Sequence, residues 1–273
     1  MLYAPDDWDS AYANAPNIPN GNRWPEQWAG RAQTFRARWA HAEIDIAYGQ
    51  AERTRLDLFR PGGDARGLVV FVHGGYWVRF DKSLWSHLAA GPLAHGWAVA
   101  VPSYTLAPAA RVGAIARQVA AAVAHAAGRV GGAIRLAGHS AGGHLVTRIV
   151  CSDALLADPV AARVERVVSV SGVHDLRPLL RVAVNGELGL DMEEARAESP
   201  ALLEPRPGTE LVAWVGAGER AEFVRQNDLL ANVWRGLGAR TLAVREPDRH
   251  HFDVIEGLAD PRSPLTRSLL ARE

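Results

Sequence analysis

The chain has 273 residues, and its 30 Lys and Arg balance 30 Asp and Glu, so the formal net charge is zero. Without a basic excess we expect neither nucleic acid nor an anionic membrane as a partner. The chain has one cysteine, Cys151, which excludes an internal disulfide and a cysteine-rich metal site. This low cysteine content fits a reducing compartment. No signal peptide or long apolar span is evident, so we expect a cytoplasmic protein. The sequence does not indicate a particular oligomeric state.

The first part of the chain differs in character from the rest. Residues 6–28 are polar and rich in turn-forming residues, yet they carry Trp8, Trp24 and Trp28. Aromatic rings in an irregular segment indicate packing against another surface. We expect residues 1–40 to form an arm that could act as a lid, and residues 41–273 to form one domain. The segments 43–49 and 53–61 alternate apolar and polar residues, which predicts two antiparallel strands.

From Gly67 onward, short apolar runs alternate with segments of helical character. The runs cover residues 67–75, 97–104, 133–140, 166–173, 210–218 and 241–247. Between two of them, residues 111–130 repeat apolar side chains at helical spacing. This alternation predicts an α/β fold with a mostly parallel sheet and helices on both faces. Catalytic groups should then lie at the carboxyl ends of the strands.

The segment GHSAG, residues 138–142, lies between an apolar run and a helical segment, and it matches the pattern G-x-S-x-G. In that setting a sharp strand-to-helix turn lifts the serine hydroxyl out of the sheet, and the small flanking residues let the neighbouring backbone approach. We therefore predict that Ser140 is a nucleophile. A purely structural turn is the alternative.

A serine nucleophile needs a histidine base and an acid, which follow it in the order acid, then histidine. One apolar run ends at Glu219, and the next is followed by His250 and His251. Spacing does not distinguish the two adjacent histidines. Glu219 is the preferred acid because it lies directly at the strand end, while Glu222 and Asp228 lie further along the next helix.

The segment GAGERA, residues 216–221, also fits the dinucleotide-binding pattern G-x-G-x-x-A. It comes too late in the chain for a complete nucleotide-binding unit, and no acidic residue ends a second strand about 20 residues further on. We expect no dinucleotide, no metal ion and no other cofactor. The expected partner is a small-molecule substrate.

Hydrolysis through a tetrahedral intermediate needs hydrogen-bond donors at the position where negative charge develops. The glycine pair after the first parallel strand occupies the place where esterases carry such a loop. We predict an oxyanion hole formed by the backbone of Gly74, Gly75 or Tyr76 together with Ala141, the residue after the nucleophile.

Three further side chains near these segments, Tyr76, Trp77 and His139, are candidates for the substrate pocket. Aromatic residues are equally common in a core, and a histidine beside a nucleophile often has only a structural role. Lys82 is the one lysine among the 30 basic residues. It either pairs with a buried carboxylate or carbonyls behind the oxyanion loop, or is a solvated residue at the start of a helix over 82–90 that Asp81 caps.

Six segments, HGGYW, FDKS, PSYTLAP, GHSAGGHL, GAGERAEFVRQN and HHFDVIEGL, together resemble the kynurenine formamidase (arylformamidase) group of α/β-hydrolases, which is related to the hormone-sensitive-lipase-like esterases. The resemblance runs from AYANAPNIP, residues 11–19, almost to the end of the chain. It implies an α/β-hydrolase fold and a small-molecule aromatic amide or ester as the substrate, with an N-formyl amide such as N-formylkynurenine as the best guess. By motif position it implies Ser140, Glu219 and His251 as catalytic residues, the histidine being the one directly before Phe252.

The match has one departure. Animal members carry aspartate at the position of Glu219, so the longer side chain must reach the histidine from a backbone set further back. Two alternatives to a formamidase remain. One is a carboxylesterase or thioesterase with the same catalytic residues, and the other is a non-catalytic protein that binds a ligand in the same pocket.

Overall fold

The computed structural model describes residues 5–153 and 155–271, and within these residues eight strands form a single sheet. Its strand order is β1-β2-β4-β3-β5-β6-β7-β8. The β1–β2 and β2–β4 pairs are antiparallel, and the remaining pairs are parallel. The predicted mostly parallel α/β sheet is therefore confirmed. The strands are β1 Ala42–Ala47, β2 Arg55–Phe59, β3 Gly67–Val72, β4 Ala98–Pro102, β5 Ala133–His139, β6 Val164–Val170, β7 Glu210–Gly216 and β8 Arg240–Glu246.

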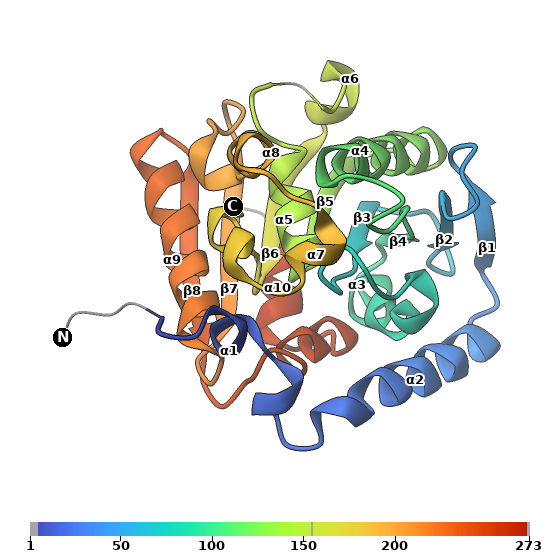
Figure 1. The fold of residues 1–273 in the computed structure, drawn as a ribbon. Helices are drawn as coiled ribbons and strands as arrows, with labels where there is room; N and C mark the ends of the chain where they lie inside the picture. Colours follow the sequence, from blue (N-terminus) through green and yellow to red (C-terminus); the bar gives the residue numbers. More distant parts are fainter. Residues whose placement is uncertain (1–4, 154, 272–273) are drawn as a thin grey trace.

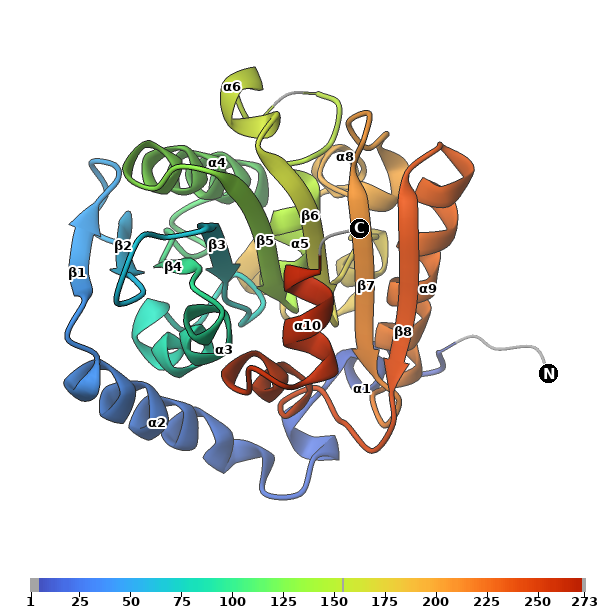
Figure 2. The same cartoon turned by 180° about the vertical axis from the view of Figure 1, so that it is seen from behind.

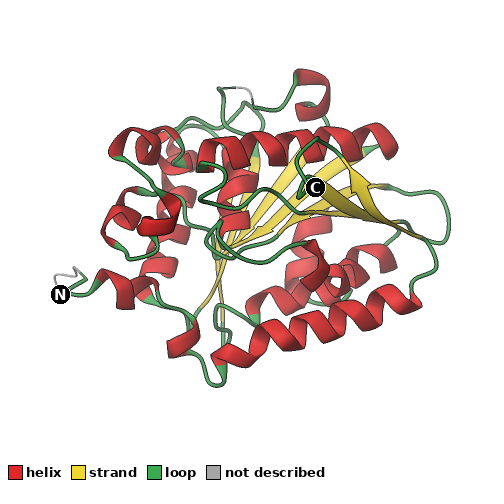
Figure 3. Ribbon diagram, turned by 45° about the vertical axis from the view of Figure 1, so that its right-hand side comes forward, coloured by secondary structure: helices red, strands yellow, loops and turns green. Residues whose placement is uncertain are grey.

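Helices cover both faces of this sheet. Figures 1 and 2 show α4, α5 and α9 on one face and α3 and α10 on the other, and Figure 3 shows the sheet between the two layers. The α-helices are α1 Trp8–Tyr12, α2 Trp24–Arg38, α3 Ala90–Ala94, α4 Val112–Arg129, α5 Ala141–Arg148, α6 Asp158–Ala161, α7 Asn185–Leu188, α8 Met192–Ala197, α9 Ala221–Gly236 and α10 Pro264–Leu270. The 3₁₀-helices are η1 Ala15–Asn17, η2 Gly21–Arg23, η3 Lys82–Leu84, η4 Ser86–Ala89, η5 Arg177–Arg181, η6 Pro200–Leu202 and η7 Val254–Ala259. None of the helices in the described ranges combines the length and apolarity that a bilayer crossing needs.

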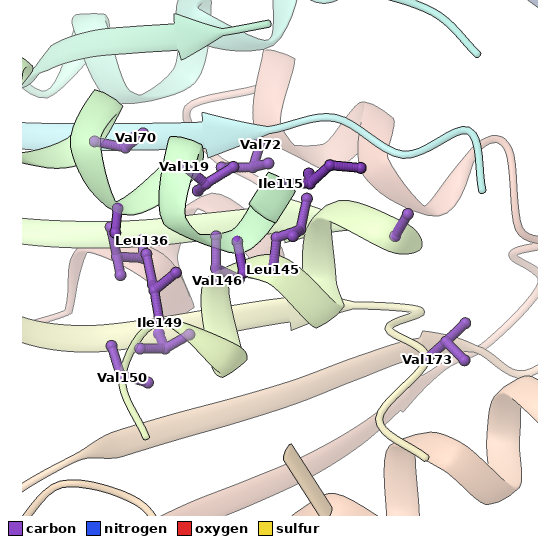
Figure 4. Close-up of a cluster of buried hydrophobic side chains, with 14 of the residues drawn as sticks. Val70, Val72, Ile115, Val119, Leu136, Leu145, Val146, Ile149, Val150 and Val173 are labelled. Atoms are coloured by element: carbon purple, nitrogen blue, oxygen red, sulfur yellow. The ribbon is translucent and has the colours of Figure 1, made fainter. Parts of the chain in front are cut away.

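The core on the α4 and α5 side follows from the spacing of apolar residues. Ile115 and Val119 lie one helical turn apart on α4 and are fully buried. They pack with Val72 of β3 and Leu145 of α5 in one apolar cluster (Figure 4). Because both helices are held by this cluster, the turn between β5 and α5 has a fixed position on the sheet.

The prediction of one continuous helix over residues 82–90 is wrong. The segment forms the short helices η3 and η4 before α3 begins at Ala90. The guanidinium of Arg36 donates to the carbonyl of Ser83 and to the hydroxyl of Ser86, so a side chain takes an acceptor that a continuous helix would use internally. The Asp81 side chain accepts a hydrogen bond from Ser83 N, as expected of a cap.

The amino-terminal segment is more helical than its composition suggests, since α1, η1, η2 and α2 occupy much of residues 8–38. Trp28 of α2 is almost completely buried, with its ring centroid 4.6 Å from that of Trp85. The tryptophans of this segment therefore include one that packs on the main body, as expected. The division of the chain near residue 40 stays a prediction.

Lys82 pairs with a buried carboxylate. Its Nζ lies 2.7 Å from Oδ1 of Asp57, a residue that is only 1 % exposed, and 3.2 Å from Oδ1 of Asp45. The solvated alternative for this lysine is therefore wrong. Cys151 behaves as a small buried apolar residue, and burial raises the pKa of its thiol to about 12.

Candidate active site

Ser140 lies at the sharp turn between β5 and α5, with φ 55° and ψ −117°. Such a left-handed φ is unfavourable for a residue with a side chain, so the surrounding structure must hold the turn in place. The amide of Ser140 donates to the carbonyl of Val170 at the end of β6, over 2.8 Å. The turn therefore sets the serine at the carboxyl edge of the sheet, beside the amino terminus of α5.

The glycines on either side of Ser140 are needed for close backbone approach. A Cβ atom on Gly138 would lie 2.1 Å from the carbonyl oxygen of Gly142, and one on Gly142 would lie 1.9 Å from that of Val72. Both distances are far inside van der Waals contact. The small residues of the G-x-S-x-G pattern thus allow β3, β5 and α5 to meet at the serine.

The side chains of Glu219 and His251 are joined by a short hydrogen bond. Glu219 follows β7, His251 follows β8, and Nδ1 of the histidine donates to Oε2 of the carboxylate over 2.6 Å. The other oxygen, Oε1, accepts from the Ser171 hydroxyl at 2.5 Å and from the Gly216 amide at 2.8 Å. The carboxylate is fully buried and has three donors. It therefore fixes the imidazole with Nδ1 protonated and leaves Nε2 as the basic nitrogen.

The other candidates for base and acid are engaged elsewhere. Nδ1 of His250 accepts from backbone amides of its own loop, and the ring packs edge-on against Trp24. Glu222 pairs with Arg225 and accepts a hydrogen bond from Tyr12. Asp228, the remaining alternative, pairs with Arg245. Of these carboxylates only Glu219 is hydrogen-bonded to a histidine at the carboxyl edge of the sheet.

The loop after β3 makes a left-handed turn over the serine. Gly75, Tyr76 and Trp77 have φ values of 115°, 51° and 57°. A Cβ atom on Gly74 would lie 2.9 Å from Cβ of Ser140, so this glycine permits the loop to approach the nucleophile. In the described ranges, the amides of Gly75, Tyr76 and Ala141 have no hydrogen-bond acceptor. These free donors beside Ser140 have the properties that an oxyanion hole requires.

A cavity of about 460 Å³ opens at Ser140. Its walls come from the amino-terminal segment, the loop after β3, the turn after β5 and the loop after β8. They comprise Tyr12, Ala13, Asn14, Ala15, Pro16, Gly21, Asn22, Pro25, Trp28, Gly74, Gly75, Tyr76, Arg79, Phe80, Trp85, His139, Ser140, His251 and Phe252. A larger hollow, of about 720 Å³, lies at the amino ends of β5 to β8 and includes none of these residues. The cavity at Ser140 is the one that can bring a substrate to the serine and histidine.

Of the three pocket candidates, the structure contradicts Trp77. Its side chain is fully buried in the core, edge-on to His144, and it does not line the cavity. The prediction for Trp77 was wrong because the left-handed turn directs the adjacent rings of Tyr76 and Trp77 to different surroundings. Tyr76 and His139 do line the cavity. Nε2 of His139 lies 2.8 Å from the carbonyl of His251, and burial together with the nearby charge of His251 keeps the pKa of His139 well below its ordinary value.

Sequence reasoning missed two kinds of residue. Ser171, which donates to Glu219, was not singled out, although a hydroxyl directly after the strand β6 is a usable signal. Arg79 and Trp85 line the cavity although they lie outside the motif segments, and Phe80, the first residue of FDKS, lines it too. Their spacing carries no signal, because the turn that brings them to the cavity is irregular.

Comparison with known proteins shows the family to which the chain belongs. Residues 69–272 match the sequence profile described as the Alpha/beta hydrolase family. The chain belongs to the alpha/beta hydrolase family. It is 31 % identical over 257 residues to the kynurenine formamidase of Salmo salar, with 87 % of this chain and 84 % of that protein covered. With the kynurenine formamidase of Danio rerio it shares 29 % identity over 241 residues, covering 83 % and 80 %.

Solved structures of hydrolases have the same fold. A protein of Silicibacter sp. TM1040, provisionally assigned as a thioesterase, superposes with a TM-score of 0.92 at 45 % identity, covering 96 % of this chain and 98 % of that one. An esterase of Pyrobaculum calidifontis superposes with a TM-score of 0.71 at 19 % identity, covering 91 % and 90 %. The similarity to kynurenine formamidases predicted from the motifs is confirmed for this alpha/beta hydrolase.

Proposed function

We propose that this hydrolase is a serine enzyme that removes the formyl group of N-formylkynurenine. The observation that carries the proposal is the Glu219–His251 hydrogen bond, 2.6 Å long, in a cavity that His251 shares with Ser140 at its strained turn. The similarity to curated kynurenine formamidases supports the choice of substrate. Cytoplasmic location, independence of cofactors and the absence of nucleic-acid partners stay predictions.

The proposed reaction has two halves. Nε2 of His251 accepts the Ser140 proton as the serine oxygen attacks the formyl carbon, and Glu219 stabilises the imidazolium that forms. The amides of Gly75 or Tyr76 and of Ala141 bind the resulting oxyanion. The imidazolium then protonates the nitrogen of the leaving arylamine, and the carbon–nitrogen bond breaks. A water molecule, deprotonated by His251, attacks the formyl-serine ester and releases formate and free Ser140.

The cavity is suited to an aromatic leaving group. A formyl group offers almost no surface for binding, so most of the binding free energy must come from the rest of the substrate. Trp28, Tyr76, Phe80, Trp85 and Phe252 supply ring surface around the cavity. Aryl rings bind such walls through offset or edge-to-face contacts.

The test is a direct comparison of substrates with the purified protein. N-formylkynurenine hydrolysis is followed by the absorbance of kynurenine, in parallel with p-nitrophenyl acetate and a short acyl thioester. We expect kcat/KM for N-formylkynurenine to exceed that for the other two. A clear preference for the thioester would move the assignment toward that of the similar Silicibacter protein. No turnover of any of the three would support a non-catalytic binding protein.

A further inference from the structure

The cavity at Ser140 has an uneven distribution of charge. Among the described residues that line it, Arg79 is the one permanently charged side chain, and none is Asp or Glu. Glu219 lies behind His251 and has its charge directed to that ring. A substrate entering the cavity therefore meets a positive charge and no facing carboxylate.

Arg79 has no partner that would give it a structural role. Across the described ranges its side chain makes no ion pair and no hydrogen bond. The contrast with a neighbour is clear, because the guanidinium of Arg53 donates to the carbonyls of Tyr104 and Phe80. A guanidinium presents five donors in a planar fork that matches a carboxylate. In Arg79 this fork is free to bind a ligand.

The backbone of Arg79 is held in a fixed relation to the serine. Its amide donates to the carbonyl of Gly75 over 3.0 Å, and its own carbonyl would lie 2.5 Å from a Cβ atom on Gly75. The next residue, Phe80, has a left-handed φ of 71°, and Arg53 binds its carbonyl. The turn that carries the free amides therefore also carries Arg79.

The charge of Arg79 acts on the inner wall of the cavity. It is one of the groups that influence the hydroxyl of Tyr76, whose pKa burial raises and Arg79 lowers. That hydroxyl donates to the carbonyl of Tyr12, and both tyrosines line the cavity. Arg79 and both tyrosines line the same cavity, so the cation can meet a substituent of a ring bound there.

We infer that Arg79 binds a carboxylate of the substrate, so that the enzyme selects acylated arylamines and aryl esters that carry an anionic group. This inference rests on the serine hydrolase proposed above. In N-formylkynurenine the anionic group is the amino-acid carboxylate, with the formyl group at Ser140 and the ring between the aromatic walls. A neutral ester can reach Ser140 without using Arg79.

The test uses matched substrates that differ only in charge. N-formylkynurenine is compared with its α-carboxamide, and 3-acetoxybenzoate with 3-acetoxybenzamide, in the wild-type protein and in Arg79→Gln and Arg79→Lys. The quantity measured is the ratio of kcat/KM for the carboxylate to kcat/KM for the amide. A charged hydrogen bond at an exposed arginine predicts that Arg79→Gln lowers this ratio about tenfold, mainly through KM. Arg79→Lys should lower it less, because the charge remains while the fork is lost.

The matched control is Arg38→Gln, an exposed arginine near the end of α2 that lies outside the cavity. It should keep the wild-type ratio, which controls for the general loss of one positive charge. A ratio that is unchanged in Arg79→Gln for both pairs, or a wild type without preference for the carboxylates, overturns the inference. Hydrolysis of the ester pair alone, with an Arg79-dependent ratio, would refute the formamidase proposal and retain the carboxylate site.

Discussion

Nδ1 of His251 donates to Oε2 of Glu219 over 2.6 Å, and the other oxygen of this buried carboxylate is held by Ser171 and Gly216. The side chain therefore acts as a rigid acceptor. One oxygen of Glu219 thus contacts the imidazole while the other is held at the end of its own strand.

Glu219→Gln should inactivate the enzyme while leaving it folded. A glutamine has one acceptor oxygen for three donors, and its NH₂ group opposes a protonated Nδ1, so the imidazole is driven to the wrong tautomer. We expect kcat to fall on the order of 10³- to 10⁴-fold. The measurement is steady-state hydrolysis of N-formylkynurenine. Glu222→Gln is the matched control and should affect stability more than rate; the reverse result would assign the acid to Glu222.

Ser140→Ala should reduce kcat/KM by on the order of 10⁴-fold or more, since the nucleophile itself is lost. Within the described residues the Ser140 hydroxyl makes no hydrogen bond, so the melting temperature should change little. Turnover of p-nitrophenyl acetate and thermal unfolding are measured together. Near wild-type turnover by the variant would exclude serine catalysis at this position.

Gly74→Ala should slow catalysis without unfolding the chain. Its Cβ atom would meet the carbonyl oxygen of His139 at 2.7 Å and Cβ of Ser140 at 2.9 Å, so the loop must withdraw from the serine. Loss of one oxyanion donor costs roughly 10²- to 10³-fold in kcat. Gly128→Ala on α4 is the control, because nothing lies within 4 Å of its added methyl group. Equal kcat for the two variants would show that the loop amides do not contribute.

Replacing Lys82 should destabilise the fold by leaving the buried carboxylate of Asp57 without a cation, although the Asp45 amide still donates to it. We expect Lys82→Met to reduce the free energy of unfolding by about 3 kcal/mol. Lys82→Arg should also destabilise, because the site holds a compact ammonium. Urea denaturation measures both. The double variant Asp57→Asn with Lys82→Met should recover much of the loss; failure to recover would mean that the lysine stabilises by packing.

The folded state should lose stability in mild acid. Burial lowers the pKa of His73 to about 4 and those of His144 and His174 to about 3, from an ordinary value of 6.5. Below pH 6.5 the unfolded chain therefore binds more protons than the folded one. The free energy of unfolding should decrease as the pH is lowered from 6.5 to about 4. Each histidine contributes about 1 kcal/mol per pH unit in this window. Urea midpoints at pH 7.5, 6 and 5 test this, and constant midpoints would contradict it.

Much of this architecture could be predicted because it depends on local pattern. The buried runs became strands, and Ser140 and Glu219 lie where strands end. The direction of a side chain within an irregular turn could not be predicted from local pattern. Trp77 has a left-handed φ of 57°, and its ring lies in the core instead of the cavity. Ser171 contacts Glu219 only because β6 and β7 are neighbours in the sheet, and spacing along the chain does not report strand order.

The arm also shows the limit of local pattern. Tyr12 lies 210 residues from its hydrogen-bond partner Glu222, and no periodicity in the sequence links the two. Tyr12 and the residues that follow it form one wall of the cavity. The prediction of an arm packed over the domain therefore came from the tryptophans, whereas its contribution to the pocket required the tertiary structure.

Local unfolding of the amino-terminal segment would remove one wall of the cavity. The amino-terminal segment is held at several points, where Tyr12 Oη donates to Glu222, Tyr76 Oη donates to Tyr12 O, and the Trp28 ring is buried against Trp85. Segments near the end of a chain commonly open before the central sheet of a protein does. If the arm detaches, Ser140, Glu219 and His251 stay in position on the sheet, but the aromatic enclosure is lost. Gentle heating should therefore broaden the range of esters accepted before it abolishes hydrolysis.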